Sequence, residues 1–286
     1  MIDMDIKSLR RKVENINSLP TIPSTLKQIS KIIEDPVISL KEIGDFISND
    51  PALTTKILKI VNSAFYGFPG RISSASHATV LLGSNVIKGL LVGASVFELM
   101  QNAMLGLWEH SLGCAITSRL MAKRKGLKDY DDIYAAGLLH DIGKIILLLE
   151  FPKEYKEAMN EAKLKNITIV ETEGDHFIAN HADIGSWLAE KWLFPRNLVE
   201  IIKYHHNPHL SKNAPIETAI VHLADILLRA KGVGFAGDPF VPAVNSVAFE
   251  ALKLSETDLK EILEEMENAL GITEELSPVT LEKSLF

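Results

Sequence analysis

Hydrophobic residues recur along most of the chain with the spacing of helices. Leu26, Ile29, Ile32 and Ile33 lie three or four positions apart, as on the buried face of one helix. Similar patterns predict helices at residues 83–103, 107–125, 131–149, 152–165, 180–192, 196–206, 215–230 and 256–269. The fold class predicted by this periodicity is all-α.

Local signals mark where several helices begin. Ser39 followed by Glu42 is a capping-box pattern, which predicts a helix from Ser39 to about residue 48. Asp50 and Pro51 supply an N-cap and a first-turn proline for the next helix. These signals support the helical pattern independently of hydrophobic spacing.

Few segments depart from this pattern. Residues 62–70 and 232–245 contain clustered glycine and proline and are predicted to be loops. Residues 166–170 are the one weak strand candidate. The most apolar stretch, residues 86–100, is shorter than the roughly 20 apolar residues that span a bilayer, so we expect a buried helix.

Composition narrows the function classes. The chain has 286 residues, 47% of them hydrophobic, and a net charge of −7, which disfavours general nucleic-acid binding. The basic runs 10–12 and 123–125 are expected to be solvated helix ends. A single cysteine, Cys114, excludes a disulfide framework and favours a reducing compartment. The N-terminal residues 1–5 are acidic and no apolar stretch follows them, so no signal peptide is apparent. We therefore expect a soluble, cytoplasmic protein without a membrane partner.

The feature with most chemical content is His140-Asp141, which lies within the apolar string Gly137 to Gly143. Burying such groups without partners costs a few kcal/mol each, so partners are expected nearby. Eight of the nine histidines fall between residues 110 and 222. This clustering predicts a metal site, with ligands chosen from His110, His140, Asp141, His181, His205, His206 and Asp225.

Imidazole and carboxylate groups without clustered thiolates suit iron, manganese, zinc or nickel, among which the sequence does not choose. A divalent ion with an open coordination position activates water and polarises a phosphoryl oxygen. Asp141 and Lys144 are the candidate catalytic residues. On a continuous helix, Lys144 would share a face with His140 and could hold a phosphate-containing ligand, such as a nucleotide, near the metal.

Simpler interpretations remain open for several of these residues. His110 could be an ordinary core or surface histidine, and His205-His206 could be a polar helix end before Asn207-Pro208. The other late histidines, His176, His209 and His222, are expected to be hydrogen-bonded or exposed rather than ligands. Cys114 is expected to be a small buried side chain.

Several motifs resemble a known family. His110, His140-Asp141 and Asp225 match the H…HD…D order of the HD superfamily of metal-dependent phosphohydrolases. The strings at 19–23, 49–53, 62–67 and 81–83 resemble the HDOD domain, a bacterial signalling variant of that superfamily. His181 to Trp192 and Tyr204-His205-His206 are similar to its C-terminal half. The resemblance covers about residues 17–270.

The resemblance implies an all-helical fold. A change in composition near residues 104–106, from histidine-poor to histidine-rich, divides the chain into an N-terminal helical subdomain, residues 1–105, and an HD-type helical bundle, residues 106–286, which we expect to pack together. The resemblance also implies a role in bacterial regulation. Many members of this family have lost catalysis and act as regulatory modules. His181, His205 and His206 are similar in order to extra ligands of HD-GYP cyclic-di-GMP phosphodiesterases. The Gly-Tyr-Pro string that defines that group is absent, and no glutamate follows His206.

Two function hypotheses follow. In the first, the chain is a metal-binding signalling module that binds a phosphate-containing ligand or a signalling protein without turnover. In the second, it is a metal-dependent phosphohydrolase or phosphodiesterase, in which His110, His140, Asp141 and Asp225 hold one ion and His181, His205 and His206 another. The aromatic residues Phe65, Tyr66 and Phe68 predict either a partner surface or a contact between the two subdomains.

Overall fold

The computed structural model describes residues 5–15, 24–62, 71–128 and 130–271, and within these ranges every regular element is helical. The N-terminal helices are α1 (Ile6–Glu14), α2 (Ser24–Ile33), α3 (Leu40–Ser48), α4 (Pro51–Val61) and α5 (Ala75–Ala103). The aromatic residues at 65, 66 and 68 lie outside the described residues. The prediction of an all-α fold is confirmed.

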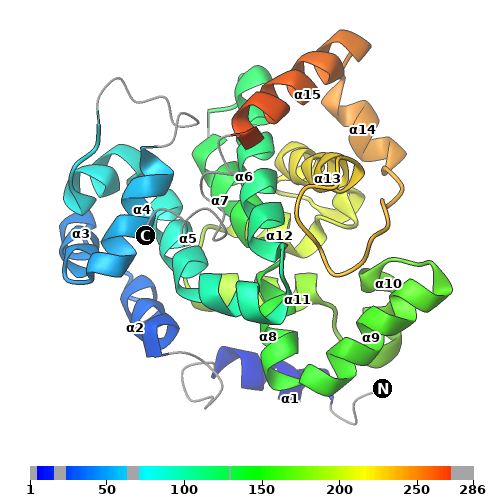
Figure 1. The fold of residues 1–286 in the computed structure, drawn as a ribbon, viewed down its shortest axis with the longest axis horizontal. Coiled ribbons are helices and arrows are strands. Elements are labelled where there is room, and N and C mark those ends of the chain that lie inside the picture. The colour runs from blue at the N-terminus through cyan, green and yellow to red at the C-terminus, as the bar shows by residue number, and fades with distance from the viewer. Residues whose placement is uncertain (1–4, 16–23, 63–70, 129, 272–286) are drawn as a thin grey trace, which may run out of the picture.

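The helices that follow carry the histidines. They are α6 (Leu107–Arg124), α7 (Tyr130–Leu139), α8 (Ile142–Glu150), α9 (Pro152–Lys165), α10 (Ile169–His176), α11 (His181–Lys191), α12 (Arg196–Tyr204), a short 3-10 turn η2 (Pro208–Leu210), α13 (Pro215–Ala230), α14 (Ser246–Leu252) and α15 (Glu256–Gly271). Figure 1 shows α2 to α5 grouped on one side of α6 and α7, with α14 and α15 at the opposite end.

The predicted helix starts are confirmed. The Ser39 hydroxyl accepts a hydrogen bond from the Glu42 amide, and the Glu42 carboxylate accepts one from the Ser39 amide, which completes the capping box. At α4, Asp50 Oδ1 accepts from the Leu53 amide at 3.0 Å. These bonds satisfy amide groups that the first turn of a helix leaves unpaired.

The long helix α5 is interrupted at Gly83, which has φ +77° and ψ 171°. The helix predicted to begin at residue 83 therefore begins earlier, at Ala75, and Gly83 marks a kink within it. By length and composition, Ala75–Ser95 is the one segment of the described chain that could cross a membrane, and 67% of its window is buried inside the molecule. It therefore serves as a packing element of the core.

Two predicted elements are wrong. The helix expected at 131–149 is divided into α7 and α8 by a turn at His140-Asp141, because the start of α8 packs directly against α11 at Gly143. The weak strand candidate at 166–170 is the link between α9 and α10 together with the first two residues of α10. Asn166 adopts a left-handed conformation at the end of α9, and Thr168 caps α10.

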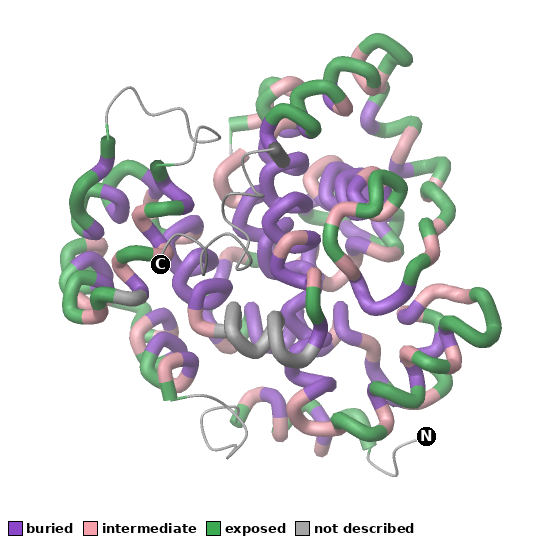
Figure 2. Tube along the Cα trace, viewed as in Figure 1, coloured by how far each residue is buried: buried purple, intermediate pink, exposed green. Residues whose placement is uncertain are grey.

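The interior of the molecule is formed mainly by α6, which packs against α7 and α13, and by α11, which packs against α12 and α8. Figure 2 shows these central helices as largely buried, whereas α3, α14 and α15 expose much of their surface. The candidate ligands lie on these central elements. The packing therefore brings residues far apart in sequence into one buried region.

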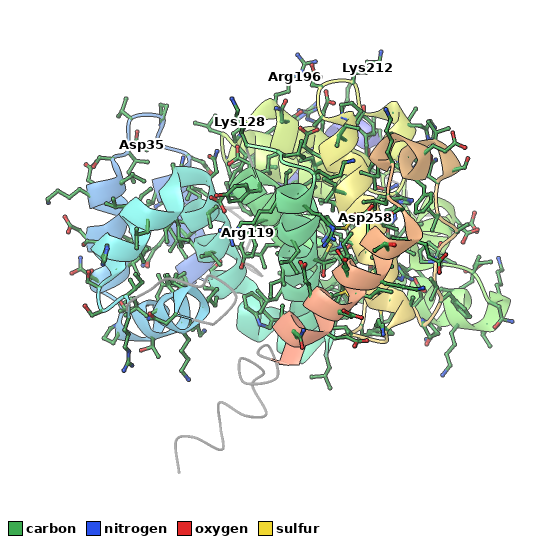
Figure 3. The ribbon with its side chains drawn as sticks, turned by 90° about the horizontal axis from the view of Figure 1, so that it is seen from above. Asp35, Arg119, Lys128, Arg196, Lys212 and Asp258 are labelled. Carbon is green, nitrogen blue, oxygen red and sulfur yellow. The ribbon has the colours of Figure 1, made fainter. Side chains whose placement is uncertain are left out.

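One basic run has a different environment from the one predicted. Arg124 is not simply solvated but forms ion pairs with Asp258, Glu261 and Glu265 of α15. Asp258 lies where α15 runs beside α6 (Figure 3). Its pKa falls to about 2, because Ser255 donates two hydrogen bonds to it and Arg124 lies beside it. Arg124 of this run thus links α15, the last described helix, to α6.

The N-terminal helices also dock on the histidine-rich part. Trp192 Nε1 donates to Ser30 Oγ at 2.8 Å, and both side chains are buried. Lys12 pairs with Glu150 at 2.7 Å, which connects α1 to the end of α8. A continuous apolar core includes residues from both parts. The two parts therefore pack together as expected, while a boundary at residue 105 stays a prediction.

Candidate metal centre

Six helices carry or flank the candidate ligands and bring them to one place. His110 lies in α6, His140 and Asp141 form the turn between α7 and α8, and Asp225 lies in α13. His181 begins α11, and His205-His206 directly follow α12. All of these side chains are buried except that of His206, which is partly exposed.

The first cluster consists of His110, His140 and Asp225. One ligand atom from each residue lies within 4.8 Å of the others. His110 Nε2 is 3.0 Å from Asp225 Oδ1, and the rings of His110 and His140 are 5.3 Å apart. Two imidazoles and a carboxylate within this distance form three sides of a site for a divalent ion.

The second cluster consists of Asp141, His181, His205 and His206, whose ligand atoms also lie within 4.8 Å of one another. His181 Nε2 is 3.2 Å from Asp141 Oδ1 and 2.9 Å from His206 Nε2. The His205 and His206 rings are 3.9 Å apart. This cluster supplies three imidazoles and one carboxylate oxygen.

Asp141 lies between the two clusters. Its Oδ2 is 3.3 Å from His140 Nε2 and 3.7 Å from His110 Nε2. Its Oδ1 instead faces His181 and His205, at 3.2 and 3.9 Å from their Nε2 atoms. The sequence interpretation grouped Asp141 with the first cluster, and the structure places it beside both.

Several atoms of this centre are buried without a hydrogen-bond partner. They are Nε2 of His110, His140 and His205 and Oδ1 of Asp141 and Asp225, whose close contacts are with one another and with His181 inside the two clusters. A buried polar atom without a partner costs about 1–3 kcal/mol, so a concentration of such atoms is unfavourable in an isolated apoprotein. Because these are the atoms that face one another across the two clusters, the residues present fit bound divalent ions.

Hydrogen bonds behind the rings fix which nitrogen faces inward. His140 Nδ1 donates to the Gly137 carbonyl and His205 Nδ1 donates to the Ile202 carbonyl, both at 2.7 Å. Since Nδ1 donates a proton in each ring, Nε2 is the nitrogen left to face a metal. The turn after α7 and the end of α12 thus supply free carbonyls for this purpose.

The charges of the centre depend on one another. Burial raises the pKa of Asp141, but His140 and Lys144 outweigh it and hold this pKa well below its ordinary value. For Asp225 the same effect of burial is outweighed by His110. Burial and the neighbouring His140 lower the pKa of His205 well below its ordinary value. The centre therefore presents ionised carboxylates and a neutral His205, the forms that bind metals.

Lys144 is buried and points toward Asp141. Its Nζ donates to Asp141 Oδ2 and to the Ala236 carbonyl, both at 2.7 Å. It lies one turn after Asp141, rather than after His140 on a continuous helix as the sequence interpretation assumed. Its predicted contact with a phosphate stays a prediction.

The loop between α13 and α14 passes beside the centre. Its buried part, residues 236–238, receives the bond from Lys144, and Asp238 pairs with Arg229. Figure 2 shows this part of the loop as buried. At Gly234, which has φ +68°, a Cβ would lie 2.4 Å from the His110 backbone nitrogen. The loop thus approaches α6 closely at the first ligand.

The histidines that were not expected to be ligands, and Cys114, are not part of the two clusters. His222 Nδ1 donates to the His205 carbonyl, and its Nε2 accepts from the Asn245 amide. His176 pairs with Glu161 outside the centre. His209 is exposed, and Cys114 is fully buried.

Glu173 was not recognised from the sequence. It is fully buried in α10, and its carboxylate accepts hydrogen bonds from His181 Nδ1 and from the Tyr155 hydroxyl. The capping pair Thr168–Glu171 could have indicated the start of α10. Nothing in the local pattern distinguishes Glu173 from the exposed acidic residues around it.

The fold and the centre define a helical His/Asp domain with paired ligand clusters. The family model for the HDOD domain matches residues 19–208, so the chain belongs to the HDOD domain family. An HDOD domain protein of unknown function from Geobacter sulfurreducens is 25% identical, with a TM-score of 0.69 and coverage of 95% of this chain and 98% of that one.

Two further comparisons extend this result. The fold is similar to that of a protein from Marinobacter aquaeolei VT8 assigned to signal transduction, at 20% identity and a TM-score of 0.70, covering 96% of this chain and 66% of that one. An uncharacterized protein of Treponema pallidum (strain Nichols) is 30% identical over 221 residues, 76% of this chain. The match spans 43% of the length of that relative.

Proposed function

We propose that this HDOD protein is a metal-binding signal-transduction module whose centre holds two divalent ions, one on each side of Asp141. The observation that carries the proposal is the convergence of buried ligand atoms from His110, His140, Asp141, His205 and Asp225, which have no hydrogen-bond partner outside the two clusters. Structural packing alone gives no reason to bury so many such atoms against one another.

The residues divide the work. His110, His140 and Asp225 would hold one ion, and His181, His205 and His206 the other, with Asp141 offering one oxygen to each. When bound, divalent ions supply Lewis acidity and lower the pKa of water. Lys144 keeps Asp141 ionised and oriented through their 2.7 Å contact.

Burial of the centre favours a regulatory role over rapid turnover. Only His206 among the candidate ligands is partly exposed, and Lys144 is engaged by Asp141 and by the loop carbonyl of Ala236. Catalytic metal sites keep a coordination position open to substrate. In this proposal the module recognises a phosphate-containing ligand or a signalling protein. Recognition is coupled to the conformation of the loop between α13 and α14, which carries Ala236.

The second candidate is a metal-dependent phosphohydrolase that acts on a nucleotide or a cyclic dinucleotide. The position of Asp141 between two clusters favours it, because paired ions joined by a carboxylate suit displacement at phosphorus. In that case Lys144 would exchange its bond to the Ala236 carbonyl for one to a substrate phosphate.

Metal analysis of variants purified without chelator tests the proposal. We expect about two ions per wild-type chain. Asp141→Asn should lose most of both, because its carboxylate serves both clusters, whereas Asp225→Asn should lose about one. His176→Ala removes a histidine outside the centre and serves as the control. A wild-type chain without metal, or an Asp141→Asn variant with full metal, would overturn the proposal.

An assay on the same samples separates the two candidates. Cyclic-di-GMP and bis(p-nitrophenyl) phosphate are supplied to the metal-loaded chain, and product is measured. Turnover that is present in wild type and in His176→Ala but lost in Asp141→Asn would establish the phosphohydrolase. Two bound ions without turnover of either substrate would support the regulatory module.

A further inference from the structure

Glu173 lies behind His181 of the second cluster and accepts two hydrogen bonds from it. Its Oε2 accepts from His181 Nδ1 at 2.6 Å and from the His181 backbone amide at 2.9 Å. Its Oε1 accepts from the Tyr155 hydroxyl at 2.8 Å. Glu173, Tyr155 and His181 are each fully buried, so these bonds form without competition from water.

This arrangement distinguishes His181 from the neighbouring ligands. His140 and His205 donate their Nδ1 protons to neutral backbone carbonyls. His181 donates to a carboxylate, which is a stronger acceptor and adds a negative charge behind the ring. An ionised carboxylate only accepts hydrogen bonds, so Nδ1 keeps its proton, and Nε2, which faces Asp141, is the nitrogen left for a metal.

Resting on the proposed function, we propose that Glu173 is a positioning residue for His181 and that it selectively supports the ion of the second cluster. Its carboxylate fixes the tautomer and the orientation of the ring and makes Nε2 a stronger donor to metal. Tyr155 in turn holds the carboxylate in place. The first cluster, formed by other elements, is independent of this support.

The structure also gives Glu173 a simpler role, because its bond to the His181 amide helps to begin α11. The two roles differ in what a conservative variant changes. Glu173→Gln keeps an oxygen acceptor of nearly the same shape and removes the charge. A residue that only begins a helix would tolerate this variant in metal binding, whereas a positioning residue would not.

The test is titration of the metal-free full chain with Mn²⁺, followed by electron paramagnetic resonance. We expect Glu173→Gln to weaken one of two binding steps by roughly 10–100-fold and to leave the other unchanged. Tyr155→Phe, which keeps every ligand and the Glu173 charge, should weaken the same step by a smaller factor. It also serves if Glu173→Gln fails to fold.

A matched control exists elsewhere in the chain. Glu161 and His176 form a carboxylate–imidazole pair of the same length, 2.6 Å, away from the clusters. Glu161→Gln should therefore leave both Mn²⁺ steps unchanged. In an Asp225→Asn background, where the second cluster holds the remaining ion, Glu173→Gln should weaken the binding of that ion. In a His206→Ala background it should have little effect on the first cluster.

The outcomes separate this inference from the proposed function. No Mn²⁺ binding by the wild-type chain would overturn both. Two wild-type binding steps that persist unchanged in Glu173→Gln and in Tyr155→Phe would overturn the role of Glu173 alone. Equal weakening of both steps would overturn its selectivity for the second cluster.

Discussion

Asp141 is one side chain that serves two ligand clusters, and its charge affects the protonation of the rings around it. Burial lowers the pKa of His140, but the adjacent Asp141 carboxylate raises it well above its ordinary value. Burial also lowers the pKa of His181, and Glu173 raises it above its ordinary value. In the metal-free chain, these two rings therefore hold protons that metal must displace.

The sign of the pH dependence follows from these shifts. A ring with a raised pKa is protonated at neutral pH in the metal-free chain and must be neutral to bind metal, so binding releases protons and affinity rises with pH. We expect metal binding to release about one proton or more per chain at pH 7. For each proton released, the metal affinity should fall roughly tenfold for each unit by which the pH is lowered. Calorimetric titration in buffers with different ionisation heats measures this release directly. Equal heats in all buffers would contradict the prediction.

At the level of elements, the centre depends on how closely α8 approaches α11. Gly143 is the second residue of α8, and a Cβ at this position would lie 2.0 Å from the His181 carbonyl oxygen. The absence of a side chain lets the Asp141 turn and the first residue of α11 meet. Gly143 therefore sets the distance between Asp141 and His181 without being a ligand.

Gly143→Ala tests this contact. We expect a loss of stability of about 1–3 kcal/mol, because the added methyl group forces two backbones apart. We also expect weaker metal binding at the second cluster, because His181 moves with the start of α11. The control is Gly174→Ala, a helical site with open space around it, where alanine should be neutral or slightly stabilising. Chemical denaturation and metal content measure both effects, and wild-type values for Gly143→Ala would refute this role.

The comparison with the sequence interpretation is informative at this level. Periodic apolar spacing and the caps at Ser39 and Asp50 predicted the helices well, because both signals are local. The break at His140-Asp141 was not predicted, since its apolar flanks continue the helical pattern and the cause, contact of Gly143 with α11, is tertiary.

The sequence indicated the candidate ligands but not their arrangement in space. Residue type and order selected His110, His140, Asp141, His181 and the later ligands, which the structure brings together. The partition into two clusters depends on which helices pack side by side. Glu173 was missed for the same reason, because its meaning comes from the contact with His181 rather than from its neighbours in sequence.

For the whole molecule, the main consequence is that the candidate metal centre and the N-terminal helices share one core. Trp192 of the histidine-rich part donates to Ser30 of α2, and Lys12 of α1 pairs with Glu150 at the end of α8. The helices α8 and α11 that receive these contacts also begin at the centre. A change in the centre is therefore expected to reach the N-terminal helices through two rigid elements.

This linkage predicts how bound metal affects unfolding. A ligand that binds only the folded state stabilises it by RT ln(1 + [L]/Kd), about 2.7 kcal/mol at a free concentration of one hundred times Kd. In a chain of 286 residues that corresponds to roughly 4–5 °C in Tm. We expect chelator to lower Tm by this amount and to shift the transitions seen by circular dichroism and by tryptophan fluorescence together. Asp141→Asn should show little further change with chelator. If fluorescence alone shifted, the N-terminal helices would unfold independently of the centre, and the shared core would not couple them.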